Sequence, residues 1–119
     1  MADVYAQARA LVRAVRESPE WQRMRKLAGP IRSDPAAEQL LASFRLKQLE
    51  LQAMALQGQQ PPPAEQQALQ RLVTQLQERP PLRQYLEAEN AYGAMLGEVQ
   101  KVLAEVFQPD VPGAVGGQR

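Results

Sequence analysis

The sequence predicts an all-α protein: a helical bundle of about four to five helices with two long antiparallel helices and coiled-coil-like seams. Apolar residues recur at spacings of three and four, and no segment shows the alternation of a strand. Apolar residues make up 45% of the chain but aromatic residues only 5%, which favours helix packing by Leu, Val, Ala and Met. A chain of 119 residues can bury one modest core, so we expect one helical domain over residues 1–108.

A helix-start signal at Ser18-Pro19 separates the first two predicted helices. The apolar residues of a first helix, over about 2–17, fall on one face; they are Val4, Ala8, Leu11, Val12 and Val15. Ser18 followed by Pro19 is typical of an N-cap with proline at the first helical position, so a second helix begins there and carries Trp21.

A long helix is predicted from the similar signal Asp34-Pro35 to about residue 57, where Gly58 provides a C-cap. One heptad seam of this helix contains Ala37, Leu41, Phe44, Gln48, Leu51 and Ala55. A second apolar row, more than a third of a turn away, contains Leu46, Leu49, Ala53 and Leu56. A single partner helix cannot cover both rows. The helix is therefore either central in the monomer or shared with another subunit, and we favour self-association or a related partner.

The second half of the chain begins with a proline connector at 61–63, which cannot continue a helix. Helices are predicted over about 64–78 and 82–107, separated by Pro80-Pro81. The last helix carries a heptad seam with one polar member, Glu89; its other members are Leu82, Tyr85, Tyr92, Leu96, Val99, Leu103 and Val106. Residues 109–119 are rich in helix breakers, which predicts a disordered tail.

The chain contains no cysteine and no histidine. This excludes disulfides, thiolate nucleophiles, the usual zinc and iron–sulfur ligands and the commonest general base. We therefore expect no catalytic residues, no cofactor, no metal site and no small-molecule substrate. No apolar run has the length of a signal peptide or a membrane span, so we expect a cytoplasmic protein without membrane insertion.

Charge is distributed unevenly. Residues 1–49 carry nine basic and five acidic side chains, a balance of +4, whereas residues 50–119 carry five and eight, a balance of −3. Arg9, Arg13 and Arg16 form a basic row that could contact phosphates or an acidic partner. We favour a solvated helix face, because no base-stacking aromatic residues accompany the row, and we do not expect direct nucleic-acid binding.

Four further residues are candidates for interaction or register. Gln48 and Glu89 are the single polar members of their seams, and we expect them to fix helix register or subunit pairing through hydrogen bonds across an interface. They do not form a plausible catalytic pair. Tyr85 and Tyr92, together with Trp21, are candidate aromatic anchors of a binding surface, with core packing as the alternative for Trp21.

Taken in order, these features resemble the YlbF/YmcA family, which includes the YheA-like proteins. The resemblance covers about residues 3–107 and lies in the order and spacing of its parts. These parts are Glu17-Ser18-Pro19-Glu20-Trp21, Asp34-Pro35, Gln39–Phe44 leading to Gln48 and Leu51-Gln52, and Pro81–Glu89 with the final seam.

The resemblance implies an all-helical regulator without enzymatic activity. Such proteins assemble with related paralogues and influence competence, biofilm formation and sporulation, in connection with ribonuclease Y and messenger RNA processing. The well-studied complex is associated with iron–sulfur clusters held by cysteines, which this chain does not contain. We therefore expect a non-catalytic adaptor that binds itself as a homodimer or YlbF-type paralogues, with the ribonuclease Y machinery as a further candidate partner. The alternatives are a direct RNA-binding protein and a purely structural homo-oligomer.

Overall fold

The computed structural model describes residues 3–108, which form five α-helices and a final short 3₁₀ helix, with no strand in this range. The helices are α1 (Val4–Glu17), α2 (Pro19–Arg32), α3 (Pro35–Leu56), α4 (Pro63–Gln77), α5 (Pro80–Leu103) and η1 (Ala104–Phe107). The all-helical prediction is confirmed. The predicted disordered tail, 109–119, lies outside the described residues.

Local sequence signals set the starts of α2 and α3 as predicted, whereas α4 and α5 begin at Pro63 and Pro80, slightly earlier than the predicted residues 64 and 82. The Ser18 hydroxyl accepts a hydrogen bond from the backbone N–H of Trp21 at 3.2 Å, so it caps α2. The Asp34 carboxylate accepts hydrogen bonds from the N–H groups of Ala36 and Ala37 at 3.2 and 3.3 Å, so it caps α3. In both helices the residue after the cap is a proline, whose fixed φ suits the first helical position.

The end of α3 is a Schellman motif. Gly58 has a φ of +76°, which a residue with a side chain rarely adopts. Its N–H donates to the carbonyl of Ala55 at 3.0 Å, and the N–H of Gln59 donates to the carbonyl of Met54 at 2.9 Å. The chain therefore turns sharply after α3, and α4 starts five residues beyond Gly58, at Pro63.

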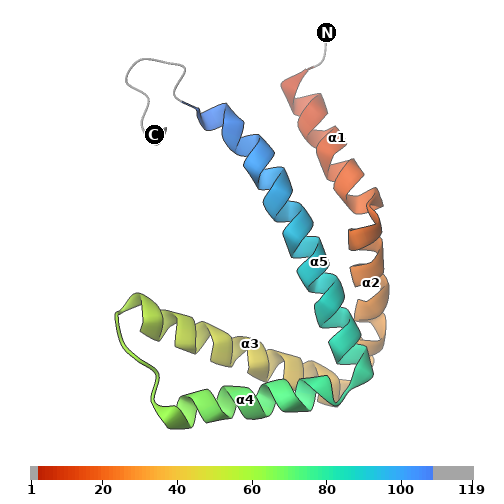
Figure 1. Ribbon diagram of the computed structural model, residues 1–119. Coiled ribbons are helices and arrows are strands. Elements are labelled where there is room, and N and C mark those ends of the chain that lie inside the picture. Colours follow the sequence, from red (N-terminus) through yellow and green to blue (C-terminus); the bar gives the residue numbers. More distant parts are fainter. Residues whose placement is uncertain (1–2, 109–119) are drawn as a thin grey trace.

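The helices form two arms that diverge from a common elbow (Figure 1). In the first arm, α1 and α2 follow one another and run antiparallel to α5, with the most extensive contact between α2 and α5. In the second arm, α3 and α4 form an antiparallel hairpin. Each long helix thus has its own antiparallel neighbours. This corrects the expectation that the two long helices pair with each other.

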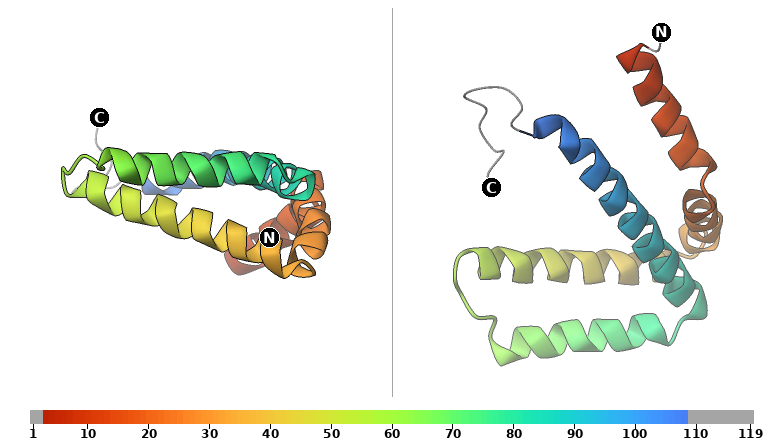
Figure 2. Two further views of the ribbon diagram at one scale, coloured as in Figure 1. Left: turned by 90° about the horizontal axis from the view of Figure 1, so that it is seen from below. Right: turned by 45° about the horizontal axis from the view of Figure 1, so that its top comes forward.

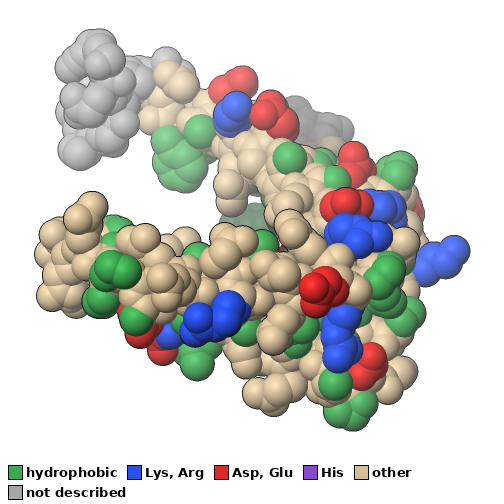
Figure 3. Space-filling model, turned by 60° about the horizontal axis from the view of Figure 1, so that its bottom comes forward, with side chains coloured by type: hydrophobic (Ala, Val, Ile, Leu, Met, Phe, Trp, Pro, Cys, Tyr) green, Lys and Arg blue, Asp and Glu red, His purple; other side chains and the backbone are tan. Residues whose placement is uncertain are grey.

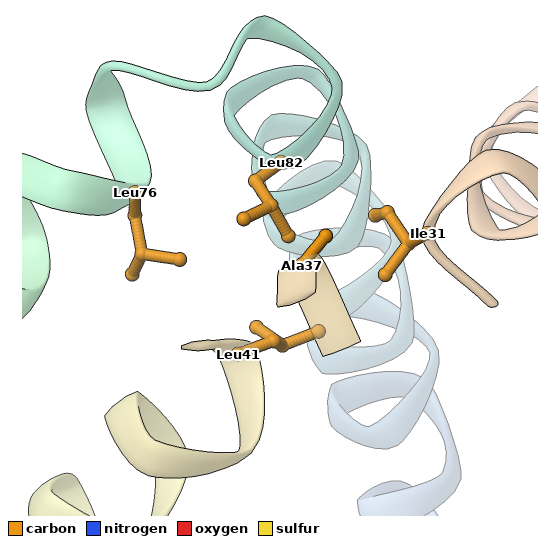
Figure 4. Close-up of a cluster of buried hydrophobic side chains, with 5 residues drawn as sticks. All are labelled: Ile31, Ala37, Leu41, Leu76 and Leu82. Carbon is orange, nitrogen blue, oxygen red and sulfur yellow. The ribbon is translucent and has the colours of Figure 1, made fainter. Parts of the chain in front are cut away.

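The core lies at the elbow, where α2, α3, α4 and α5 meet (Figure 4). Its buried side chains are Ile31, Ala37, Leu41, Leu76 and Leu82, and Leu40, Phe44, Tyr85 and Leu86 pack around them. Leu82 is completely buried, with 0% of its surface exposed. An ion pair between Asp34 and Arg79, at 3.7 Å, joins the two connections that cross the elbow. The two arms of the described chain are therefore joined to each other only near the elbow.

The molecule is flat and open (Figure 2). It measures 52 × 38 × 17 Å, and the thickness of 17 Å is less than two helix diameters of about 10–12 Å. Its radius of gyration is 19.2 Å, whereas a compact domain of this length would have about 13.5 Å. Both faces of a helical layer this thin are exposed, so residues 3–108 leave several of their own apolar side chains uncovered.

Candidate functional site

The large exposed apolar side chains of residues 3–108 gather in two places, one on each arm. Those on the first arm lie on α1 and at the end of α5 and η1; they are Val4, Tyr5, Val12, Val102, Leu103, Val106 and Phe107. Those on the second arm are Leu46, Leu49 and Leu56 of α3. Figure 3 shows apolar side chains at the surface of both arms and a hollow between them. Such clusters mark interaction sites more often than scattered single residues do.

The surface on the first arm includes a groove between α1 and α5, here called the α1–α5 groove. It is lined by Leu11, Val12, Val15, Arg16, Trp21, Tyr92, Leu96, Val99, Gln100 and Leu103. The groove exists because α1 diverges from α5 towards its N-terminal end (Figure 1).

Helix α1 leaves its apolar face largely uncovered. The apolar residues predicted to share one face are not buried by the rest of the described chain, because α1 contributes no buried residue. Leu11 and Val15 are only half-buried, and Val4 is 77% exposed. The periodicity located the apolar face correctly, but within residues 3–108 the chain provides too little surface to bury it.

The groove ends, on the side nearest the elbow, at a pair of aromatic rings. The centroids of Trp21 and Tyr92 are 5.3 Å apart and their planes are inclined by 53°, a favourable tilted arrangement. Both residues are half-buried and both line the groove. Trp21 therefore packs against its neighbour and contributes to a surface at the same time, so the two alternatives for this residue are compatible.

The second surface is the α3 row, defined as Leu46, Leu49, Ala53 and Leu56. The three leucines are 59%, 62% and 89% exposed, and Ala53 is exposed as well. The other apolar row of the helix, more than a third of a turn away, supplies the buried residues Ala37 and Leu41. Of the two alternatives for this helix, a central place within the described chain is thus excluded, and the row is left uncovered.

A polar cluster links the two arms close to the elbow. Glu89 of α5 forms an ion pair with Arg45 of α3 and accepts a hydrogen bond from the Tyr85 hydroxyl at 3.1 Å. Partial burial acts to lower the pKa of Arg45, but its interactions with Tyr85 and Glu89 outweigh that effect and raise the pKa above its ordinary value. The cluster joins α3 to α5 where the arms begin to separate.

Arg45 is a residue that the sequence prediction missed. Glu89 and Gln48 were expected to play matching roles, but Gln48 is exposed and takes part in none of the side-chain hydrogen bonds found in residues 3–108. A signal for Arg45 did exist. Arg45 lies ten residues after Pro35 and Glu89 nine residues after Pro80, so the two opposite charges are about 15 and 14 Å along helices that start at the same elbow.

A second polar cluster fastens α3 to α4. The Lys47 ammonium lies 2.6 Å from the Glu65 carboxylate and 3.0 Å from that of Glu50. Hydrogen bonds to Glu65 and then to Glu50 raise the pKa of Lys47 above its ordinary value. This cluster stabilises the hairpin of the second arm near its middle.

The basic row of Arg9, Arg13 and Arg16 is exposed on α1. None of the ion pairs found between residues 3 and 108 involves these three arginines. Arg16 also lines the α1–α5 groove. The structure therefore places positive charge at one border of the groove.

Within residues 3–108, no three acidic side chains gather into a group that could hold a metal ion. None of the helices in the same range has the length and apolarity needed to cross a membrane. What the arrangement provides is two uncovered apolar surfaces on arms held by polar clusters.

Known proteins share this sequence and fold. A family model described as control of competence regulator ComK, YlbF/YmcA, matches residues 4–106. A UPF0342 protein of Symbiobacterium thermophilum is 37% identical over 109 residues, covering 92% of this chain and 97% of that protein. A UPF0342 protein of Caldicellulosiruptor saccharolyticus is 32% identical over 105 residues, covering 88% of each chain.

A solved structure has a similar arrangement of helices. It is a protein of unknown function (DUF964) from Bacillus stearothermophilus, with a TM-score of 0.73 and 25% sequence identity, covering 86% of this chain and 90% of that one. The helical fold is thus shared by a natural relative. With the family model matching nearly the whole described range, the chain belongs to the YlbF/YmcA family of control-of-competence regulators.

Proposed function

We propose that this protein is a non-catalytic regulatory adaptor, which binds other protein chains through its uncovered apolar surfaces. The observation that carries the proposal is that α1, an amphipathic helix of 14 residues, buries none of its residues within the described chain. A helix this short is marginal in water without tertiary packing. A partner that covers its apolar face would therefore stabilise the arm.

The α1–α5 groove suits an amphipathic helix. From Tyr92 to Leu103 its α5 wall is about 16 Å long, which matches about three turns of helix. Helix-in-groove binding relies on apolar side chains spaced three and four residues apart. The Trp21–Tyr92 pair provides a rigid aromatic anchor of the kind that contributes strongly at interfaces.

We propose that the occupant of the groove is a helix of a YlbF-type paralogue, and that the assembly acts with ribonuclease Y in messenger RNA processing in the cytoplasm. Support comes from membership of the family and from the fit of an amphipathic helix to the groove. The exposed row of Arg9, Arg13 and Arg16 favours a partner with acidic residues beside its apolar stripe, because complementary charge speeds association.

The test is affinity capture of the tagged protein from lysate of its native host, followed by mass spectrometry. Wild type is compared with Val99→Glu, which places a charge inside the groove, and with Asn90→Glu, which places the same charge at an exposed position on the same helix. We expect wild type and Asn90→Glu to recover paralogues or ribonuclease Y, and Val99→Glu to lose them.

A nuclease-treated control separates this proposal from the main alternative. If the partners disappear after nuclease treatment, the basic row is the functional surface and direct RNA binding replaces the adaptor. Recovery of the bait alone would contradict the adaptor and leave a purely structural homo-oligomer.

A further inference from the structure

We infer that the α3 row is covered by the same row of a second copy, so that two α3 helices pack antiparallel about a two-fold axis. The inference rests on the proposed function, because it assumes that the uncovered apolar surfaces bind protein. It goes further by assigning a second copy of the chain as the partner that binds the second arm. The α1–α5 groove then stays free for a different partner.

The spacing of the row is that of a coiled-coil seam. Together with the exposed Ala42, its members are separated by four, three, four and three residues, which corresponds to alternating d and a positions of a heptad. A stripe this narrow is matched by one helix with the same period. Its exposure of 59% to 89% at the leucines shows that no such helix is supplied by the described chain.

The row is complementary to itself when reversed. If the two-fold axis passes the helix at the level of residue 51, Leu46 lies opposite Leu56 of the second copy, and Leu49 lies opposite its Ala53. Large side chains then face small ones at the centre and leucines face leucines at both ends. This alternation of sizes allows close packing without voids.

The flanking charges are compatible with this pairing. Glu50 borders the row and would lie near Glu50 of the second copy, and two like charges repel. Within each copy, the Lys47 ammonium lies 3.0 Å from the Glu50 carboxylate of the same chain and so offsets the repulsion. Gln52, on the other border of the row, is uncharged and exposed, so it can approach its own counterpart.

The amount of apolar surface sets the strength of the dimer. The row extends over about 15 Å of helix, which corresponds to about one and a half heptads. An interface of this length is smaller than a standard protein–protein interface, so the dimer should be weak and depend on concentration.

Cysteine cross-linking tests the geometry, since the natural chain contains no cysteine. In the antiparallel pair, residue 52 approaches its own counterpart. Gln52→Cys should therefore give a covalent dimer with a short bismaleimide, whereas Gln48→Cys, which is exposed but off the row, should not. Leu46→Cys alone should give no covalent dimer, whereas a mixture of Leu46→Cys with Leu56→Cys should cross-link. A parallel pair would instead cross-link Leu46→Cys to itself.

A charge in the row tests the surface independently. Leu49→Glu should weaken dimerisation at least tenfold, as measured by sedimentation equilibrium, while the matched variant Gln48→Glu should leave it unchanged. Circular dichroism verifies that both variants are folded, which is expected because both positions are exposed. Equal dimerisation of Leu49→Glu and wild type would overturn the inference, as would a wild-type chain that stays monomeric at high concentration.

The two proposals fail in different ways. Val99→Glu in the groove should retain the Gln52→Cys cross-link and lose the captured partners. Cross-linking without any captured partner would support the α3 pair and contradict the adaptor. Captured partners without cross-linking would support the adaptor and overturn the α3 pair.

Discussion

Five of the seven buried apolar side chains found in residues 3–108 lie in one place, the elbow. Leu82 has no exposed surface and contacts residues of other helices, whereas Leu56 is 89% exposed at the far end of α3. The same substitution at these two positions therefore separates core packing from surface exposure.

We predict that Leu82→Ala lowers the free energy of unfolding by about 2–5 kcal/mol, through lost burial and the cavity left behind. Leu56→Ala should change it by less than about 0.5 kcal/mol. Urea denaturation followed by circular dichroism, at a concentration where the chain is monomeric, measures both. Equal losses would show that the elbow is not the main core.

Glu89 is predicted to influence assembly more than stability. Its ion pair with Arg45 is partly exposed, so removing it should cost less than about 1 kcal/mol. Because the pair joins α3 to α5, Glu89→Leu should change the angle between the arms, and with it the oligomeric state or the choice of partners. The exposed Glu87→Leu is the matched control. If Glu89→Leu leaves sedimentation and captured partners unchanged, the proposed role of Glu89 is wrong.

At the scale of the helices, the turn after α3 depends on one backbone conformation. The φ of +76° at Gly58 is unfavourable for any residue with a Cβ, although nothing lies within 4 Å of the position that a Cβ would occupy. We predict that Gly58→Ala destabilises the protein by about 1 kcal/mol. Gly93→Ala, inside α5 and also free of contacts, should stabilise it by about 0.5–1 kcal/mol. Thermal unfolding of the two variants should therefore shift in opposite directions.

The hairpin of α3 and α4 should respond to alkaline pH. The folded-state pKa of Lys47 is raised above its ordinary value of 10.5 by Glu65 and Glu50, so its ion pairs add stability fully below that value. This contribution is lost as the pH rises through the raised pKa. We predict that wild type exceeds Lys47→Gln in urea midpoint at neutral pH and that the difference disappears at high pH. A difference that grows with pH would contradict the role of Lys47.

Helix existence and helix starts could be predicted because their causes are local. Ser18-Pro19 and Asp34-Pro35 act on N–H groups two or three residues away, and Gly58 acts within one turn. The pairing of helices could not be predicted in the same way. Periodicity shows which face of α1 or α3 is apolar, but not whether the chain contains anything that covers it.

The candidate site was predictable only in part. The α3 row, Tyr85, Tyr92 and Glu89 were identified from heptad spacing, and the structure places the two tyrosines and Glu89 on the contact side of α5. Arg45 was missed because it lies between the two apolar rows of α3, where a charged residue is typical of a solvated face. Its ion pair with Glu89 depends on how α3 and α5 diverge from the elbow, and periodicity does not give that arrangement.

The shape of the whole molecule connects these features to function. A layer 17 Å thick, anchored at one end, leaves one apolar surface on each arm. Two surfaces on separate arms allow one chain to hold two other chains at once. This is the arrangement that the proposed adaptor needs.

Hydrogen–deuterium exchange of the free chain and of the captured complex tests the central claim most directly, since it reports which helices a partner covers. We predict slower exchange in the complex for α1 and for the α5 and η1 residues 96–107, with little change in α4. Protection confined to α4, or none in either arm, would contradict the claim that partners bind the uncovered apolar surfaces.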